Sequence, residues 1–156
     1  MLEGIPMYPV YFLILGVILG VLQITFLRAA IAEAFLLAFI VSNVGLQGVF
    51  AFLGHFFKSD EVARGIGWPA GNPFQKEIAF TNLSLGILGI LCVWFRGDFW
   101  LATIIARSVF TWGAAGIHLA DTKKRKNTSI FNAGPVLYFD LFFPCLLIGL
   151  FIASQV

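Results

Sequence analysis

The chain has 156 residues, of which 60% are hydrophobic and 12% charged, and its net charge is +2. Soluble domains carry roughly 45–50% apolar and 25% charged residues, so this composition argues against a soluble domain and favours an integral membrane protein. The small net charge gives no support for nucleic-acid binding. The only two cysteines, Cys92 and Cys145, lie inside apolar runs, which argues against a disulfide framework or a zinc site.

Five apolar runs fill the chain, and each reaches the roughly 20 residues that an α-helix needs to cross a bilayer. They are residues 7–27, 29–57, 73–95, 99–120 and 135–154. None shows the alternation of apolar and polar residues that is typical of membrane β-barrel strands. The sequence therefore predicts an all-α fold, a single integral membrane helix bundle over residues 1–156 with five transmembrane helices.

The first run carries Gly16 and Gly20, a spacing that lets two helices approach closely. Residues 1–4 before it lack the basic residues of a signal peptide, so we interpret the run as a retained membrane helix. The second run follows almost at once, which predicts a tight turn near residues 27–31. The two runs should therefore form an antiparallel helix pair.

A polar loop over residues 58–72 separates the second and third runs, and its Trp68 is placed to anchor at the lipid–water interface. Asn72 and Pro73 give the third helix a capping residue and a favoured first position. The third and fourth runs are joined by a short turn at residues 96–98. Pro144 inside the last run predicts a kink, because it cannot donate a backbone N–H to the carbonyl of Asp140.

Basic residues predict the orientation, since they concentrate on the cytoplasmic side of membrane proteins. With five spans, only Arg28 and Arg96 fall on one side. The other side receives Lys58, Arg64, Lys76, Lys123, Lys124, Arg125 and Lys126. We therefore predict a multi-pass protein of the cell membrane with the N-terminus in the cytoplasm and the C-terminus outside.

Arg107 lies well inside the fourth run, where a charged side chain costs about 2.5–3.5 kcal/mol on insertion scales. It should therefore face protein, water or an acidic partner. On a helical period of 3.6 residues, the positions on the same side of the helix are Thr111, Ala114, His118 and Asp121. The fourth helix thus carries one stripe of polar and small residues.

Other polar residues divide by their expected depth. His55, Glu77, His118 and Asp140 lie near the predicted cytoplasmic ends of four helices. Asn43, Gln47, Asn82 and Arg107 lie deeper. As candidate ligand-binding residues we take His55, Glu77, Asn82, Arg107, His118 and Asp140.

Two interpretations of this set remain open at this stage. The side chains either hydrogen-bond between helices as structural groups or form a site. As a site, apolar walls with a few polar groups favour a quinone or a lipid. A haem held by His55 and His118 is also compatible. No spacing typical of metal ligands and no nucleophile motif occurs, so the sequence assigns no cofactor, metal or catalytic residue.

The segment GIGWPAGNPFQKEIAFTN at residues 65–82, with Gly86–Gly89, Phe99-Trp100 and residues 113–118, resembles an uncharacterised family of small bacterial and archaeal membrane proteins. More distantly it is similar to DoxX-type small membrane proteins. The resemblance implies a helical bundle. DoxX-like proteins include quinone-linked redox subunits, so it also favours a quinone-associated role, although this chain has one span more than a four-helix pattern.

Three functions are consistent with these features. The first is an accessory or small-ligand-binding membrane subunit that takes a quinone or lipid. The second is a small transporter or channel that acts as a homo-oligomer. The third is a purely structural subunit of a larger membrane complex.

Overall fold

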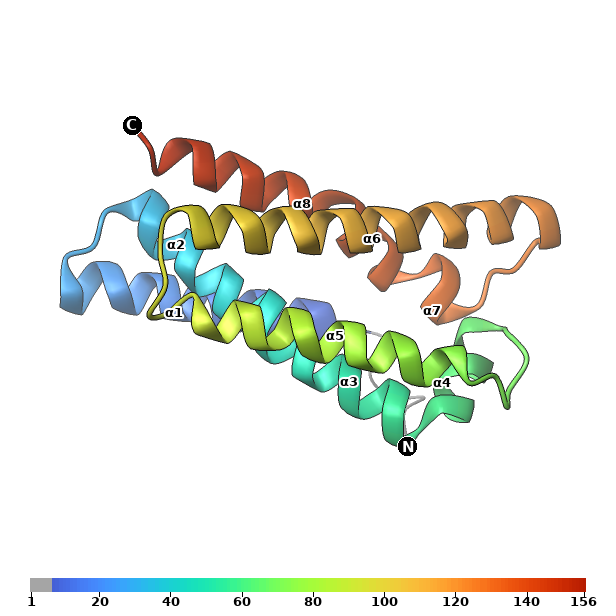
Figure 1. Cartoon of the computed structure of the whole chain (residues 1–156). Helices are drawn as coiled ribbons and strands as arrows, with labels where there is room; N and C mark the ends of the chain where they lie inside the picture. The colour runs from blue at the N-terminus through green and yellow to red at the C-terminus, as the bar shows by residue number, and fades with distance from the viewer. Residues whose placement is uncertain (1–6) are drawn as a thin grey trace.

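The computed structural model describes residues 7–156, and within that range every regular element is helical (Figure 1). The all-α prediction is confirmed for this part of the chain, and the interpretation of residues 1–4 lies outside it. In chain order the elements are α1 (Tyr8–Leu27), α2 (Ile31–Phe39), the π-helical segment η1 (Ile40–Leu46), α3 (Gln47–Phe57), α4 (Ser59–Ile66), α5 (Phe74–Leu91), α6 (Asp98–Arg125), α7 (Ile130–Ala133) and α8 (Pro135–Ala153).

Four helical stretches are long and apolar enough to cross a membrane, which gives the described chain the character of a multi-pass membrane protein. They are Tyr8–Leu27, Ile31–Phe57, Asp98–Arg125 and Ile130–Ala153. The prediction of five spans is not confirmed. The helix that falls short is α5, because it has only 18 residues and its first turn carries Gln75, Lys76 and Glu77.

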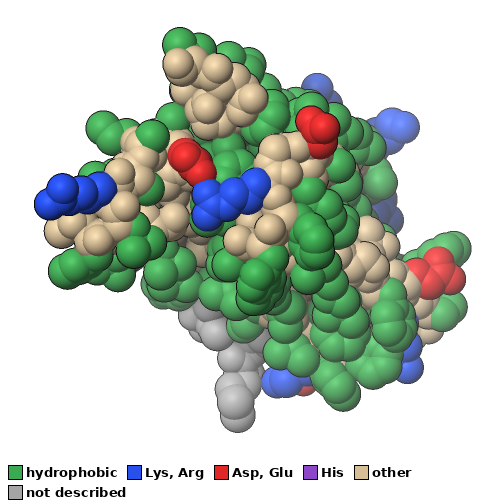
Figure 2. Space-filling view, turned by 60° about the vertical axis from the view of Figure 1, so that its left-hand side comes forward, with side chains coloured by type: hydrophobic (Ala, Val, Ile, Leu, Met, Phe, Trp, Pro, Cys, Tyr) green, Lys and Arg blue, Asp and Glu red, His purple; other side chains and the backbone are tan. Residues whose placement is uncertain are grey.

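Short turns gather Arg28 and Arg96 at one end of the bundle, as predicted for the less basic side. Arg28 adopts a left-handed conformation with φ 53° in the α1–α2 turn. Arg96 precedes α6 and forms an ion pair with Glu33 at the start of α2. Figure 2 turns this end forward and shows few blue or red side chains in a surface that is otherwise green and tan.

The backbones of η1, α3 and α5 touch through glycines. A Cβ atom on Gly48 would lie 2.8 Å from the carbonyl oxygen of Asn82, and one on Gly86 would lie 3.0 Å from the carbonyl oxygen of Gly45. A Cβ on Gly89 would meet the backbone of Gly45. These glycines let α5 pack directly along its neighbour, so its position depends on close backbone contact.

The apolar core occupies the half of the bundle that carries the short turns. Leu36 of α2, Ile40 of η1, Ile104 of α6 and Leu147 of α8 are fully or almost fully buried there. Toward the opposite end, Figure 1 shows α6 diverging from α3 and α5, with α7 beside α6 and α4 beside the ends of α3 and α5. This second half of the bundle contains a cavity.

The glycine contact gives a direct test of the packing. We expect Gly89→Ala to lower the free energy of unfolding by about 1–3 kcal/mol, because the added methyl group overpacks a backbone contact. The matched control is Gly113→Ala on α6, where the space around the new Cβ is open. It gains the same helix propensity without a clash and should be neutral or stabilising. Unfolding in SDS–detergent micelles measures both variants, and equal stabilities would contradict the packing.

Candidate functional site

The hollow half of the bundle contains a cavity of about 500 Å³. Its walls come from α3, α4, α5, α6 and α8, with Tyr8 of α1 at one side and Phe131 of α7 at another. Most lining side chains are apolar. The polar ones are Tyr8, Gln47, His55, Lys58, Trp68, Gln75, Asn82, Arg107, Thr111, His118 and Asp140. An apolar cavity with a few polar groups is the usual form of a small-molecule site.

Several apolar residues that line the cavity are also exposed at the surface of the bundle. Leu53 and Phe57 belong to α3, Ile78 to α5 and Ile117 to α6. The cavity wall is therefore continuous with an outer surface that is hydrophobic. In a membrane that surface would meet acyl chains, so a lipid-soluble molecule could reach the cavity from the side.

The polar stripe predicted on α6 faces this cavity. Arg107, Thr111, Ala114 and His118 all line it. The spacing explains the result, since residues three, four, seven and eleven apart share one side of an α-helix. Thr111 donates its hydroxyl to the carbonyl of Arg107 at 2.9 Å, so it satisfies its own polar group within α6.

Arg107 is only 4% exposed, and its Nε has no hydrogen-bond partner among the described residues. Asp140 of α8, 9% exposed, is its charged neighbour in the cavity wall. The ion pairs of the described residues join other side chains, so these two charges do not come within 4.0 Å of one another. Two opposite charges thus face one cavity without direct contact.

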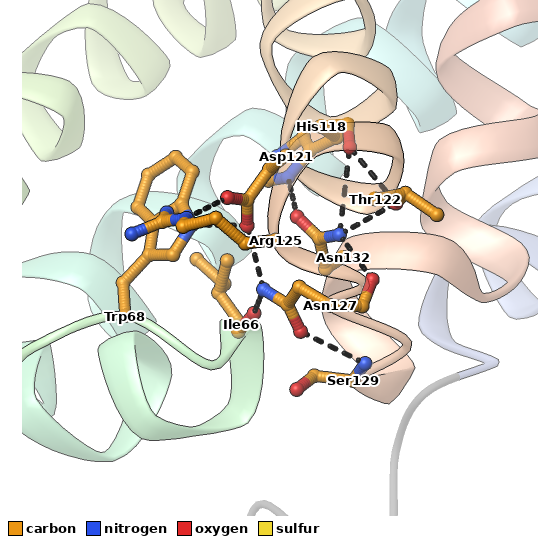
Figure 3. A network of polar contacts seen from close by, with 9 residues as sticks. All are labelled: Ile66, Trp68, His118, Asp121, Thr122, Arg125, Asn127, Ser129 and Asn132. Atoms are coloured by element: carbon orange, nitrogen blue, oxygen red, sulfur yellow. Dashed lines mark hydrogen bonds and ion pairs between the residues drawn. The ribbon is translucent and has the colours of Figure 1, made fainter.

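His118 is held by a polar network at the end of the cavity (Figure 3). Its Nδ1 lies 2.8 Å from Oδ1 of Asn132, at the end of α7. The Asn132 amide in turn donates to Oγ1 of Thr122 at 2.8 Å and to the carbonyl of Asn127 at 2.9 Å. The ring of Trp68 stacks on His118 with 5.3 Å between centroids. These contacts leave the imidazole little freedom to rotate.

Asp121, one turn beyond His118, organises the loops next to this network (Figure 3). Its carboxylate accepts hydrogen bonds from Nε1 of Trp68 at 3.0 Å and from Nδ2 of Asn127 at 2.7 Å, and it pairs with Arg125. Asn127 also donates to the carbonyl of Ile66 at 2.8 Å. One buried carboxylate therefore connects the end of α6 to the loop that follows α4.

His55 and Asn82 complete the polar lining. His55 of α3 lies with Nδ1 2.7 Å from Oε1 of Gln75 on α5, which joins the two helices across one wall. Asn82 uses its Nδ2 to donate to the carbonyl of Ile78, one turn earlier on α5, at 2.9 Å. Gln47 also lines the cavity, whereas Asn43 points its amide at the carbonyl of Phe12 on α1.

Five of the six candidate residues thus line one cavity: His55, Asn82, Arg107, His118 and Asp140. Glu77 does not, and its side chain is exposed on α5. Sequence reasoning missed Gln75 and Asn132 as hydrogen-bond partners of the two histidines and Trp68 as the ring that stacks on His118. Gln75 stands two residues before Glu77, on the opposite side of the helix, and no feature of the loop sequence singles out Asn132.

Over residues 7–156 no three His, Cys, Asp or Glu side chains gather in a way that could hold a metal ion. The two histidines each use one ring nitrogen for a side-chain hydrogen bond. The second nitrogen of each remains for other contacts.

Comparison with known families agrees with the coarser part of the prediction, membership of an uncharacterised family, and shows neither a link to DoxX-type proteins nor a bacterial or archaeal origin. Residues 6–156 match a family of unknown function, DUF6790. No curated protein and no solved structure matches the chain.

The network around Asp121 gives a second test. We expect Asp121→Ala to lower the free energy of unfolding by about 1–3 kcal/mol, because it leaves the Trp68 and Asn127 donors without their acceptor. Glu77→Gln, an exposed acid on α5, is the control and should change stability little. The same unfolding titration measures both. A stability loss no larger for Asp121→Ala than for Glu77→Gln would contradict the role given to this carboxylate.

Proposed function

The chain belongs to DUF6790, a family of unknown function, and from that premise we propose that it is an accessory membrane subunit that binds a small lipid-soluble ligand, a quinone or a lipid, in the cavity. The observation that carries the proposal is Arg107, a buried guanidinium that faces the cavity and whose Nε has no partner among the described residues.

Electrostatics supports a ligand at this position. Arginine stays protonated in proteins, and a buried charge is stable only when it is paired or hydrogen-bonded. Asp140 compensates part of that charge from a distance but makes no ion pair with Arg107. A ligand oxygen placed between them would accept from the guanidinium. A water molecule would accept the same hydrogen bond, and direct identification of the bound molecule distinguishes the two.

The shape of the cavity supports an amphipathic ligand. The buried part of the cavity wall includes the polar side chains of Asn82, Arg107 and Asp140. The exposed part includes the apolar residues Leu53, Phe57 and Ile117. A head group would lie near Arg107 while an alkyl or isoprenoid tail extends outward. The likeness to DoxX-type proteins is consistent with a quinone, and a neutral lipid fits the same geometry.

We also propose that α5 crosses the membrane, which gives five spans. It is not among the four helices that length and hydropathy select. Its close glycine contact with η1 and α3, which belong to one of the four candidate spans, supports a crossing beside them. Its outer side presents Phe80 and Ile87, which are exposed apolar residues suited to lipid. With five crossings, the basic residues put the start of α1 in the cytoplasm and the end of α8 outside.

A transporter is the second candidate, since another cavity of about 290 Å³ adjoins the first. It shares Trp68, Gln75 and Ile78 with the main cavity and reaches Arg125. A path through both would connect the bundle interior with the basic end of the molecule. Flux into proteoliposomes would support this function, whereas stoichiometric co-purifying proteins without a ligand would support a structural subunit.

Native mass spectrometry of the purified protein tests ligand binding. We expect the wild-type protein to retain a small lipid-soluble molecule and Arg107→Leu to lose it, because the variant removes the buried hydrogen-bond donor. Arg64→Leu on α4, an exposed arginine outside the cavity, should retain it. Equal retention by the two variants would reject the site, and absence of any ligand from the wild type would reject the function.

Cysteine labelling tests the topology. In a background without Cys92 and Cys145, we expect an impermeant maleimide added to intact cells to label Gln155→Cys. Glu61→Cys on α4 should react only after the membrane is permeabilised, since the three crossings of α5, α6 and α8 put the two positions on opposite faces. The cysteine-free parent controls for background. Labelling of both positions from one face would mean that α5 does not cross.

A further inference from the structure

The hydrogen-bonding roles of several atoms around the cavity are fixed by partners outside it, and together they describe the head group of the ligand. The inference rests on the proposed function and specifies which hydrogen bonds the head group donates and accepts. A backbone carbonyl can only accept, so any amide that donates to one has its oxygen and nitrogen positions determined.

His118 is fixed as an acceptor by this reasoning. Nδ2 of Asn132 donates to the carbonyl of Asn127 at 2.9 Å, so the oxygen of that amide must be the atom beside His118. An amide oxygen only accepts, and therefore Nδ1 of His118 carries the proton (Figure 3). In a neutral imidazole the other nitrogen, Nε2, is then a hydrogen-bond acceptor.

Asn82 is fixed in the same way. Its Nδ2 donates to the carbonyl of Ile78 at 2.9 Å, so its Oδ1 is an acceptor in the cavity wall that no residue in the range 7–156 uses. Asp140 adds a third acceptor, since its carboxylate is in no ion pair with the described residues. Three fixed acceptors from α5, α6 and α8 therefore line the same cavity.

Fixed donors are fewer. Arg107 donates into the cavity and the Asn82 amide keeps a second N–H, while three other lining residues direct their donors elsewhere. Lys58 lies 3.5 Å from Glu61, Trp68 donates to Asp121, and Thr111 donates to the carbonyl of Arg107. The remaining polar groups, Tyr8, Gln47, His55 and Gln75, can donate or accept by rotating or changing tautomer.

We infer that the cavity selects an amphipathic molecule whose head group donates hydrogen bonds through hydroxyl groups as well as accepting from Arg107. A head group that only accepts, such as a quinone, would leave His118, Asn82 and Asp140 unsatisfied. A hydroquinone or the free hydroxyl of a neutral lipid would satisfy at least one of them. The oxidised and reduced forms of one quinone should therefore differ in affinity.

Anaerobic calorimetric titration of the purified protein in detergent tests this inference. The probes are 2-decyl-1,4-benzoquinone and its hydroquinone, with dioleoylglycerol and trioleoylglycerol as a lipid pair with and without a hydroxyl. We expect the hydroxylated member of at least one pair to bind about 10-fold more tightly, as one additional hydrogen bond to a fixed acceptor would give. The pair that shows the difference identifies the source of the ligand.

Two variants assign the preference to the acceptors. Asp140→Asn replaces one acceptor oxygen with a donor and should reduce the preference to less than about threefold. His118→Phe keeps an aromatic ring against Trp68 but removes Nε2, and it serves if Asp140→Asn fails to fold. Glu77→Gln lies outside the cavity and should keep the wild-type preference.

The outcomes separate the two proposals. If the wild-type protein binds none of the four probes, the proposed function fails and the inference fails with it. If it binds them without preferring the hydroxylated members, the inference alone is overturned. A preference that survives both Asp140→Asn and His118→Phe would overturn the assignment of these acceptors.

Discussion

Arg107 puts a permanent positive charge at 4% exposure into a wall that is mostly apolar. Such a charge is costly in a low-dielectric interior unless opposite charge and hydrogen bonds surround it. Asp140 supplies opposite charge from the same cavity wall without forming an ion pair with Arg107, so the guanidinium remains available.

The two halves of the bundle have different structural roles. In one half, glycine contacts and a core around Ile40, Ile104 and Leu147 fix the helices against each other. In the other, α4, α7 and the Asp121 network hold the ends of the helices apart and orient His118. A rigid support beside an open cavity is what a site needs to present polar groups at constant positions.

Helical periodicity explains which parts of this picture the sequence could predict. The stripe on α6 was correct because its residues share one helix face, and the signal at Pro73 and the apolar run that begins at residue 135 predicted the starts of α5 and α8 closely. Glu77 was predicted at the correct end of α5, but it lies on the exposed side of the helix. The residue that faces inward is Gln75, two residues earlier. Asn43 and Gln47 were grouped by their expected depth. The wider turns of η1 separate them, so that Asn43 contacts α1 while Gln47 lines the cavity. Asn127 and Asn132 lie in or beside a loop, where no period constrains position.

The central claim is that the fold leaves Arg107 unpaired so that a molecule outside the protein can pair with it. A crystal structure grown from a lipidic phase, without added ligand, tests this most directly. We expect density for a non-protein molecule larger than water within hydrogen-bond distance of the guanidinium and between it and Asp140. A direct ion pair between Arg107 and Asp140, with the cavity collapsed around it, would contradict the account.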